Sequence, residues 1–163
     1  MGGVAFTISC NLSLNRKTVS QVYALPNTGA NGFAFIDTRC AKAIAMFLKL
    51  PLQRLESPIR IRGYDGHANQ SVSHYLICNL VVDQRRLLQV PFLVLDLGNH
   101  DLILGSDWFS HYDVQPDLRR RRLVWPKALP ARTCFAQEIK RTLLDLYNQA
   151  EQPPNARHQA DVH

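Results

Sequence analysis

Hydrophobic and polar residues alternate along much of the chain in the pattern of short β-strands. Two β-rich runs, "VAFTISCNLSL" at residues 4–14 and "TVSQVYAL" at 18–25, are separated by the turn-prone "NRK", which predicts an opening hairpin. Strand-like runs return from residue 59 onward as "IRIRGYDG", "SVSHYLICNLVV", "LLQVPFLVLDL" and "RRLVWP". The close spacing of strands and turn signals predicts a mainly β domain that folds into a compact barrel or sandwich.

Helical periodicity appears in two segments. In the first, Asp37 or Thr38 can cap a short helix that Pro51 ends. Its apolar face is formed by Ala41, Ile44, Ala45 and Leu48. The second segment, residues 135–151, follows a connector at 127–134 and precedes a polar, proline-bearing tail at 152–163, for which we expect disorder. The apolar face of this second helix is formed by Phe135, Ile139, Leu143 and Leu146.

Composition narrows the class of protein. The chain has 163 residues, of which 46% are hydrophobic, enough for one packed domain. Its four cysteines are far apart in sequence, which favours reduced, mostly buried thiols over zinc binding or a disulfide framework. No apolar run approaches a membrane span and no signal-peptide pattern is present, so we expect a protein inside the cell, in the cytoplasm or in virus-like particles.

The net charge of +6 is concentrated partly in the run Arg119–Arg122. A basic run permits contact with nucleic acid, but phosphate binding needs basic residues gathered on one surface, and the sequence alone shows no such surface. We therefore do not expect a nucleic-acid partner from the sequence. The six histidines show no metal-binding spacing, and we expect neither a metal nor a cofactor.

Three motifs suggest a particular chemistry. The first is the apolar lead-in and turn "ALPNTGA" at residues 24–30, the second is the glycine-punctuated "GYDGHAN" at 63–69, and the third is "ILGSDWF" at 103–109. In this order and spacing they resemble the active-site loop, the flap and the apolar-apolar-Gly segment of retropepsins. These are the aspartic proteases of retroviruses and long-terminal-repeat retrotransposons. The resemblance covers about residues 4–126.

The resemblance implies a retropepsin-like β-barrel, closed or partly open, with one internal helix and a C-terminal helix. It divides the chain into a protease domain at 1–126, a connector with its helix at 127–151, and a tail at 152–163. It further implies an endopeptidase that processes a polyprotein as a homodimer, because the reaction uses two carboxylates, one from each subunit.

The same resemblance assigns roles to individual residues. Asn27 occupies the position of the catalytic aspartate, and Thr28 and Gly29 complete the catalytic loop. The substrate would contact Ala30, Asn31, Tyr64, Asp65 and Gly66. Support for the loop would come from Ile103, Leu104, Gly105 and Asp107, the last by pairing with an arginine or, alternatively, as a solvated or capping acid.

The amide at Asn27 departs from the family pattern. It has nearly the size of a carboxylate but no proton to exchange near neutral pH, so we expect the sequence as written not to cleave peptides. Asp37 is better explained as a helix cap than as a replacement acid. The otherwise intact loop and the "MGG" start favour a deliberate change from aspartate. A naturally inactive domain for dimerisation or peptide binding is the alternative.

Overall fold

The computed structural model describes residues 6–62 and 69–134, and these form ten strands and two helices. The strands are β1 (Ile8–Leu14), β2 (Lys17–Pro26), β3 (Ala34–Asp37), β4 (Gln53–Arg62), β5 (Asn69–Val82), β6 (Arg85–Leu95), β7 (Leu102–Leu104), β8 (Gln115–Asp117), β9 (Arg122–Val124) and β10 (Arg132–Cys134). The helices are α1 (Thr38–Leu48) and α2 (Ser106–Tyr112). The N-terminal five residues, the expected flap tip, the expected C-terminal helix and the tail lie outside the described residues.

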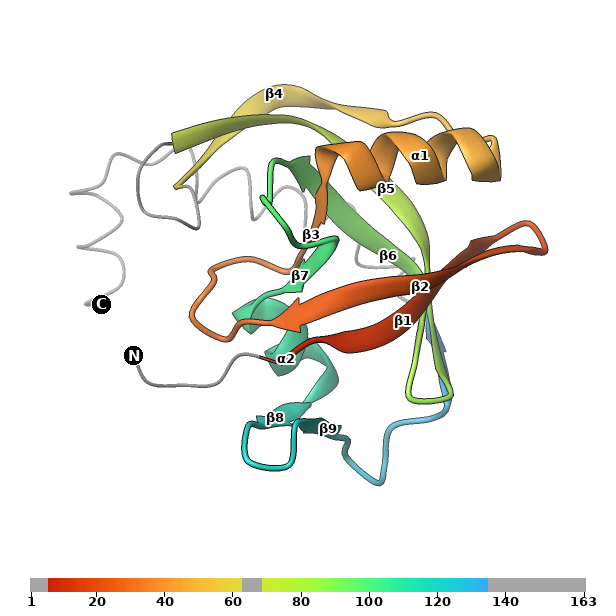
Figure 1. Ribbon diagram of the computed structural model, residues 1–163, viewed down its shortest axis with the longest axis vertical. Helices are drawn as coiled ribbons and strands as arrows, with labels where there is room; N and C mark the ends of the chain where they lie inside the picture. The colour runs from red at the N-terminus through yellow and green to blue at the C-terminus, as the bar shows by residue number, and fades with distance from the viewer. Residues whose placement is uncertain (1–5, 63–68, 135–163) are drawn as a thin grey trace.

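Six strands form a closed barrel (Figure 1). They follow the order β6-β3-β7-β2-β1-β5, and the ring closes because β5 also pairs with β6. Strand β4 pairs with β5 outside the ring, β10 runs parallel to the start of β6, and β8 and β9 form a separate two-stranded sheet. The mainly β barrel predicted from the sequence is confirmed.

Two tight turns set the register of the longest hairpins. Asn15 and Arg16, between β1 and β2, both have positive φ, at 51° and 66°. Asp83 and Gln84, between β5 and β6, also have positive φ, at 50° and 62°. Two consecutive left-handed residues make a turn whose twist matches the twist of the paired strands. The predicted opening hairpin is therefore confirmed, with Leu14 opposite Lys17.

Helix α1 begins and ends as the sequence predicts. Asp37 is its N-cap, and Ala41, Ile44 and Leu48 are buried against the barrel. The helix ends at Leu48, before Pro51, and its C-cap Lys49 adopts the left-handed conformation at φ 53° and donates its N–H back to the last turn.

Helix α2 is a second internal helix that we did not expect. It has only seven residues, too few for a clear helical period, and three of them, Trp108, Phe109 and Tyr112, are buried. Residues 132–134, placed in a connector by the sequence, form the short strand β10.

The buried side chains form two clusters, one on each side of β7. Leu104 belongs to the larger cluster, which fills the barrel and includes residues from α1 and α2. Ile103 belongs to a smaller cluster with Ala30, Phe35 and residues of β4, β5 and β6. Neighbouring side chains of a strand point to opposite faces, so Ile103 and Leu104 of β7 contribute to different clusters and the strand lies between the two.

The cap of α1 provides a test of how the barrel holds this helix. The Asp37 carboxylate accepts hydrogen bonds from the N–H of Arg39 (3.1 Å) and of Leu97 (2.9 Å). We predict that Asp37→Ala lowers the free energy of unfolding by about 2 kcal/mol, because both donors lose their partner. Urea denaturation followed by circular dichroism measures this change.

The matched control is Glu56→Ala, which removes an exposed carboxylate from β4. Its effect should stay within about 0.5 kcal/mol. Equal losses in the two variants would show that Asp37 contributes nothing specific as a cap.

Candidate active site

The candidate site is built on the connection between β2 and β3. Strand β7 lies between these two strands, parallel to β2 and antiparallel to β3. The chain must therefore leave β2, cross the end of β7 and return on its other side. Residues 27–33 make this crossing, so the loop passes over the point where β7 ends and α2 begins (Figure 1).

Asn27 is fixed at the start of the loop by three hydrogen bonds. Its N–H donates to the Leu104 carbonyl (2.9 Å), which continues the pairing of β2 with β7. Its side-chain oxygen Oδ1 accepts from the N–H of Gly29 (3.1 Å), and its own carbonyl accepts from the N–H of Ala30 (3.0 Å). A carboxylate could accept the Gly29 bond equally well, so this turn geometry suits Asp and Asn alike.

The loop residues after Asn27 divide into exposed and buried positions. Thr28, Gly29 and Asn31 are exposed, whereas Ala30 is buried in the smaller cluster, with 5% of its surface exposed. Asn27 itself is half-buried. The structure therefore presents the Asn27–Gly29 segment at the surface and anchors it through Ala30.

Gly105 lies directly behind the loop. Its N–H donates to the Phe33 carbonyl (2.8 Å), and the next residue, Ser106, donates to the Ala30 carbonyl (2.9 Å). A Cβ added at Gly105 would overlap the Gly32 carbonyl oxygen and lie 3.0 Å from the Ala30 carbonyl oxygen. The backbone φ of Gly105 is −92°, so the need for glycine here is steric and not conformational.

Gly32 is a second required glycine, which the sequence analysis missed. Its φ is +119°, and a Cβ there would lie 2.5 Å from the Phe35 ring. Its carbonyl accepts from the N–H of Asp107 (3.0 Å). The second glycine of "GANG", residues 29–32, is a sequence signal for a turn. Only the structure shows that the Phe35 ring fills the space beside Gly32.

The other predicted support residues are placed as follows. Ile103 and Leu104 are buried in β7, and Leu104 also supplies the carbonyl that Asn27 binds. Asp107 lies in the first turn of α2 and forms no ion pair within residues 6–62 and 69–134. Partial burial raises the pKa of its carboxyl. Trp108 is fully buried, in edge-to-face contact with Phe109.

The predicted substrate contacts at Tyr64, Asp65 and Gly66 lie outside the described residues. The base of that hairpin is described, and a side chain braces it. Gln70 donates through Nε2 to the Asp96 carbonyl and accepts through Oε1 from the Asp96 N–H, both at 2.8 Å. The Asp96 carboxylate in turn accepts from the Thr38 hydroxyl at 2.7 Å. These contacts link β5, the end of β6 and the start of α1.

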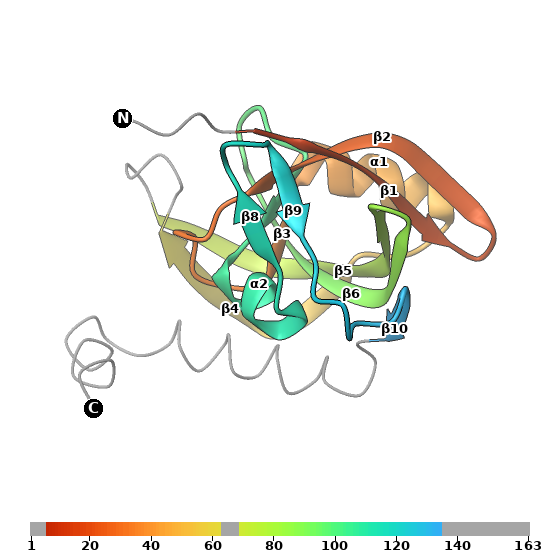
Figure 2. The ribbon, with the colours of Figure 1, turned by 90° about the horizontal axis from the view of Figure 1, so that it is seen from below.

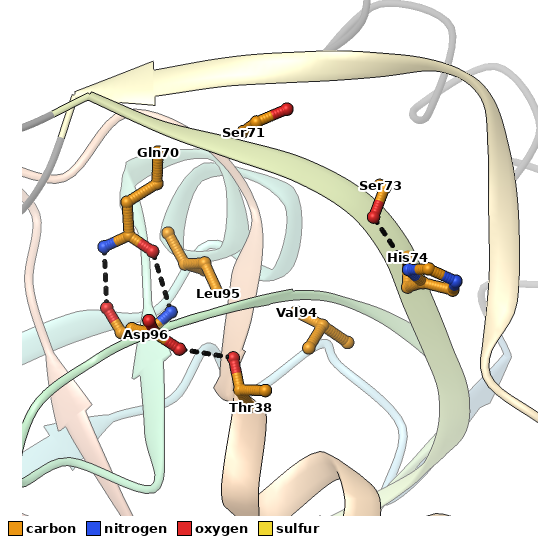
Figure 3. Close-up of a pocket in the computed structure, with 8 residues that line it drawn as sticks. All are labelled: Thr38, Gln70, Ser71, Ser73, His74, Val94, Leu95 and Asp96. Atoms are coloured by element: carbon orange, nitrogen blue, oxygen red, sulfur yellow. Dashed lines mark hydrogen bonds between the residues drawn. The ribbon is translucent and has the colours of Figure 1, made fainter.

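A polar pocket of about 190 Å³ lies beside this brace (Figure 3). His74 and Ser73 line its opposite wall, and the Ser73 hydroxyl is 2.8 Å from Nδ1 of His74. No sequence signal pointed to the brace, because Gln70 and Asp96 are 26 residues apart and neither belongs to a motif.

Three cysteine thiols are free and lie in or beside the core. Burial raises the pKa of Cys10, Cys40 and Cys78 to about 12, so these thiols stay protonated at neutral pH. Within the described residues, no cluster of three or more His, Cys, Asp or Glu side chains could hold a metal ion. No helix in the same part of the chain is long and apolar enough to span a membrane.

Comparison with known proteins gives the family. The model of the PEG10/RTL1 protease domain matches residues 23–134, which is more than half of the chain. The chain belongs to this family. Its closed barrel is thus that of a retropepsin-type, protease-like domain, and the matched residues include the loop at 27–33 and Gly105.

One solved structure of the same kind is similar to the chain. It is the retroviral protease-like domain of Ddi1 from Leishmania major, with 18% sequence identity and a TM-score of 0.49. The match covers 78% of this chain and 99% of that one. No curated protein matches the chain.

The seating of the retropepsin-type loop can be tested at Gly105. We predict that Gly105→Ala lowers the free energy of unfolding by about 3 kcal/mol, since the added methyl group meets backbone atoms that cannot rotate away. Urea denaturation measures the change.

Gly98→Ala serves as the control, because Gly98 has φ +67° but open space around its Cβ position. That variant should lose only about 1 kcal/mol from backbone strain. A Gly105→Ala protein as stable as the parent would show that the loop does not rest on this glycine.

Proposed function

We propose that this chain is a retroelement-type, polyprotein-processing aspartic protease domain that works as a homodimer and that Asn27 holds in an inactive form. The observation that carries the proposal is the geometry of Asn27. It sits where β2 meets the turn, it makes the hydrogen bond to Gly29 that a carboxylate would make, and the residues beside it are exposed.

A dimer is required by the chemistry of the reaction. Aspartic proteases use two carboxylates that share a proton, one acting as base on water and the other as acid toward the carbonyl oxygen. This chain has one such loop, at residues 27–30. Thr28 and Gly29 are exposed, so a two-fold axis beside them would place the loop of a second copy against the first.

An amide at position 27 in place of a carboxylate abolishes proton transfer there and keeps the hydrogen bonds that position the loop. With Oδ1 occupied by the Gly29 N–H, Asn27 would present its NH₂ group where an aspartate presents its second oxygen. Two facing carboxylates repel unless a proton is shared, whereas the NH₂ group of one amide can donate to the second lone pair of the Oδ1 atom of the facing amide. The dimer of this chain is therefore expected to form at least as readily as that of the corresponding aspartate protein.

Peptide binding should persist without cleavage. Substrates of this family bind as extended strands, through backbone hydrogen bonds and pockets for alternate side chains. Ala30 of the loop and Ile103 of β7 belong to the apolar cluster that also includes residues of the β4–β5 hairpin. This cluster could form the wall for an apolar peptide side chain, and nothing in it depends on the chemical identity of residue 27.

The proposal predicts that Asn27→Asp creates peptidase activity. Incubation with a mixed peptide library at mildly acidic pH, followed by mass spectrometry, should show cleavage at least about 100-fold above the parent chain, because the variant restores acid–base catalysis. The rate should fall as the pH rises and the shared proton is lost. Asn27→Ala is the control, since it removes the amide without supplying an acid.

A folded, dimeric Asn27→Asp protein that cleaves neither the library nor a longer precursor would contradict the enzyme proposal. That result would favour the second candidate, a naturally inactive module for dimerisation or peptide binding. The observation that favours this candidate is that the loop is fully formed around an amide. Fluorescence anisotropy of labelled peptides from the library would then measure their binding to the uncleaving protein directly.

The dimer itself can be tested at Thr28. We propose that its exposed hydroxyl hydrogen-bonds across the two-fold axis, so Thr28→Ala should weaken dimerisation about tenfold or more in sedimentation equilibrium. Thr28→Ser keeps the hydroxyl and should stay within about threefold of the parent. Equal affinities for all three proteins would place Thr28 outside the dimer contact.

A further inference from the structure

The net positive charge of the chain lies almost entirely in two short segments, residues 83–86 and 117–132. These 20 residues contain eight of the 19 Lys and Arg residues and two of the 13 Asp and Glu residues. Their excess of six positive charges equals the formal net charge of the whole chain, +6. The rest of the chain is therefore balanced, and the excess is a local property.

Contacts between the two segments hold the turn at residues 83–86 against residues 125–132, which directly follow the β8–β9 hairpin with its arginine run. The Trp125 indole N–H donates to the Asp83 carboxylate (2.8 Å), and the Arg85 guanidinium lies 4.9 Å from the centre of the Trp125 ring. Arg85 also donates to the Leu129 carbonyl (2.9 Å). The turn between β5 and β6 is thus held against the chain that follows β9.

The second link is a short stretch of parallel pairing. The N–H of Arg86 donates to the Ala131 carbonyl (2.8 Å), and Arg132 is the partner of Arg86 in the register of β6 and β10. Figure 2 views this end of the molecule directly, with the β8–β9 hairpin, the connecting chain and β10 following one another across it. We define the basic face as residues 85, 86, 119–122, 127 and 132.

Few of these charges are neutralised locally. Asp117 lies 3.4 Å from Arg120 and 3.6 Å from Arg122, and its other oxygen accepts the Arg120 backbone N–H. That backbone hydrogen bond and the two arginines lower the pKa of Asp117.

Five residues of the basic face are exposed and have no carboxylate partner within the part of the chain that the structure describes. They are Arg86, Arg119, Arg121, Lys127 and Arg132. These five residues are available to an anionic partner.

We propose that the basic face binds nucleic acid through its phosphodiester backbone. Seven of the eight basic residues are arginines, whose planar fork of donors matches phosphate oxygens better than a lysine does. Four successive arginines, Arg119–Arg122, run from the tip of the β8–β9 hairpin into the first residue of β9. Contacts to phosphate carry no base information, so binding should be independent of sequence. This proposal does not depend on the peptide-binding loop or on its activity.

The structure changes the interpretation of the arginine run. The sequence alone favoured a solvated strand or linker for this run, because nothing placed other basic residues beside it. Trp125 and the β6–β10 pairing supply that placement. A clustered basic surface is what counterion release requires, since each neutralised phosphate adds to the affinity.

The test uses the whole chain and a fluorescein-labelled, mixed-sequence 20-nucleotide single-stranded RNA, with DNA of the same sequence in parallel. If about four phosphates are neutralised, raising the salt from about 50 to about 200 mM should weaken binding roughly 50-fold. Binding that salt does not weaken, or no binding at the lower salt, would overturn the proposal. A preference for RNA over DNA would indicate 2′-hydroxyl contacts in addition to the proposed phosphate contacts.

The variant Arg119→Gln/Arg121→Gln should weaken binding about tenfold or more at the lower salt and reduce its salt dependence. Its matched control, Arg39→Gln/Lys42→Gln, removes the same charge from exposed positions on α1, at the opposite end of the molecule from the β8–β9 hairpin (Figure 1). The control should bind within about twofold of the parent.

Equal losses in the two variants would mean that net charge, and not the basic face, drives binding. A polyglutamate chain that displaces the RNA at equal charge concentration would indicate an acidic protein partner instead. Either result would overturn the proposal.

Discussion

The backbone hydrogen bonds that seat the 27–33 loop on β7 and α2 are the constraint on which the candidate site depends. Leu104, Gly105 and Ser106 together bind the two ends and the middle of the loop through main-chain atoms. Such bonds fix the position of residue 27 whatever its side chain is. The close approach they require is possible only because Gly105 has no Cβ to meet the Gly32 carbonyl.

The same bonds would hold the loop equally well with an amide or with a carboxylate at position 27. Among residues 6–62 and 69–134, the Asn27 side chain accepts a hydrogen bond from the Gly29 N–H, and an amide oxygen and a carboxylate oxygen are equivalent in that role. The two side chains differ in the second atom, because a carboxylate oxygen can take up a proton near neutral pH and an amide NH₂ group cannot. Architecture and activity are therefore separable in this domain, and a fold-level match establishes only the first.

Local signals in the sequence were sufficient for the elements near them. The Asp37 cap, the apolar spacing of Ala41, Ile44 and Leu48, and the turn at residues 15–17 each act over a few residues and were predicted correctly. The motifs contained both the loop at 27–30 and Gly105, and the structure places these two segments in contact, whereas the roles predicted for them stay predictions.

Features that depend on distant partners could not be predicted. Helix α2 is too short to show a helical period, and it is stabilised by the burial of Trp108, Phe109 and Tyr112. The brace between Gln70 and Asp96 joins strands 26 residues apart through one amide side chain. The basic face forms only when Trp125 meets the turn at residues 83–86. In each case the determining contact is tertiary, and no local pattern encodes it.

The separation of the two Asn27 side chains in a crystal structure of the assembled protein tests the central claim most directly. The account predicts a two-fold dimer in which the side-chain amides of the two copies face each other within hydrogen-bond distance, about 3 Å, at the floor of a shared groove. A lone subunit, or a dimer whose 27–30 loops lie on opposite faces, would contradict it.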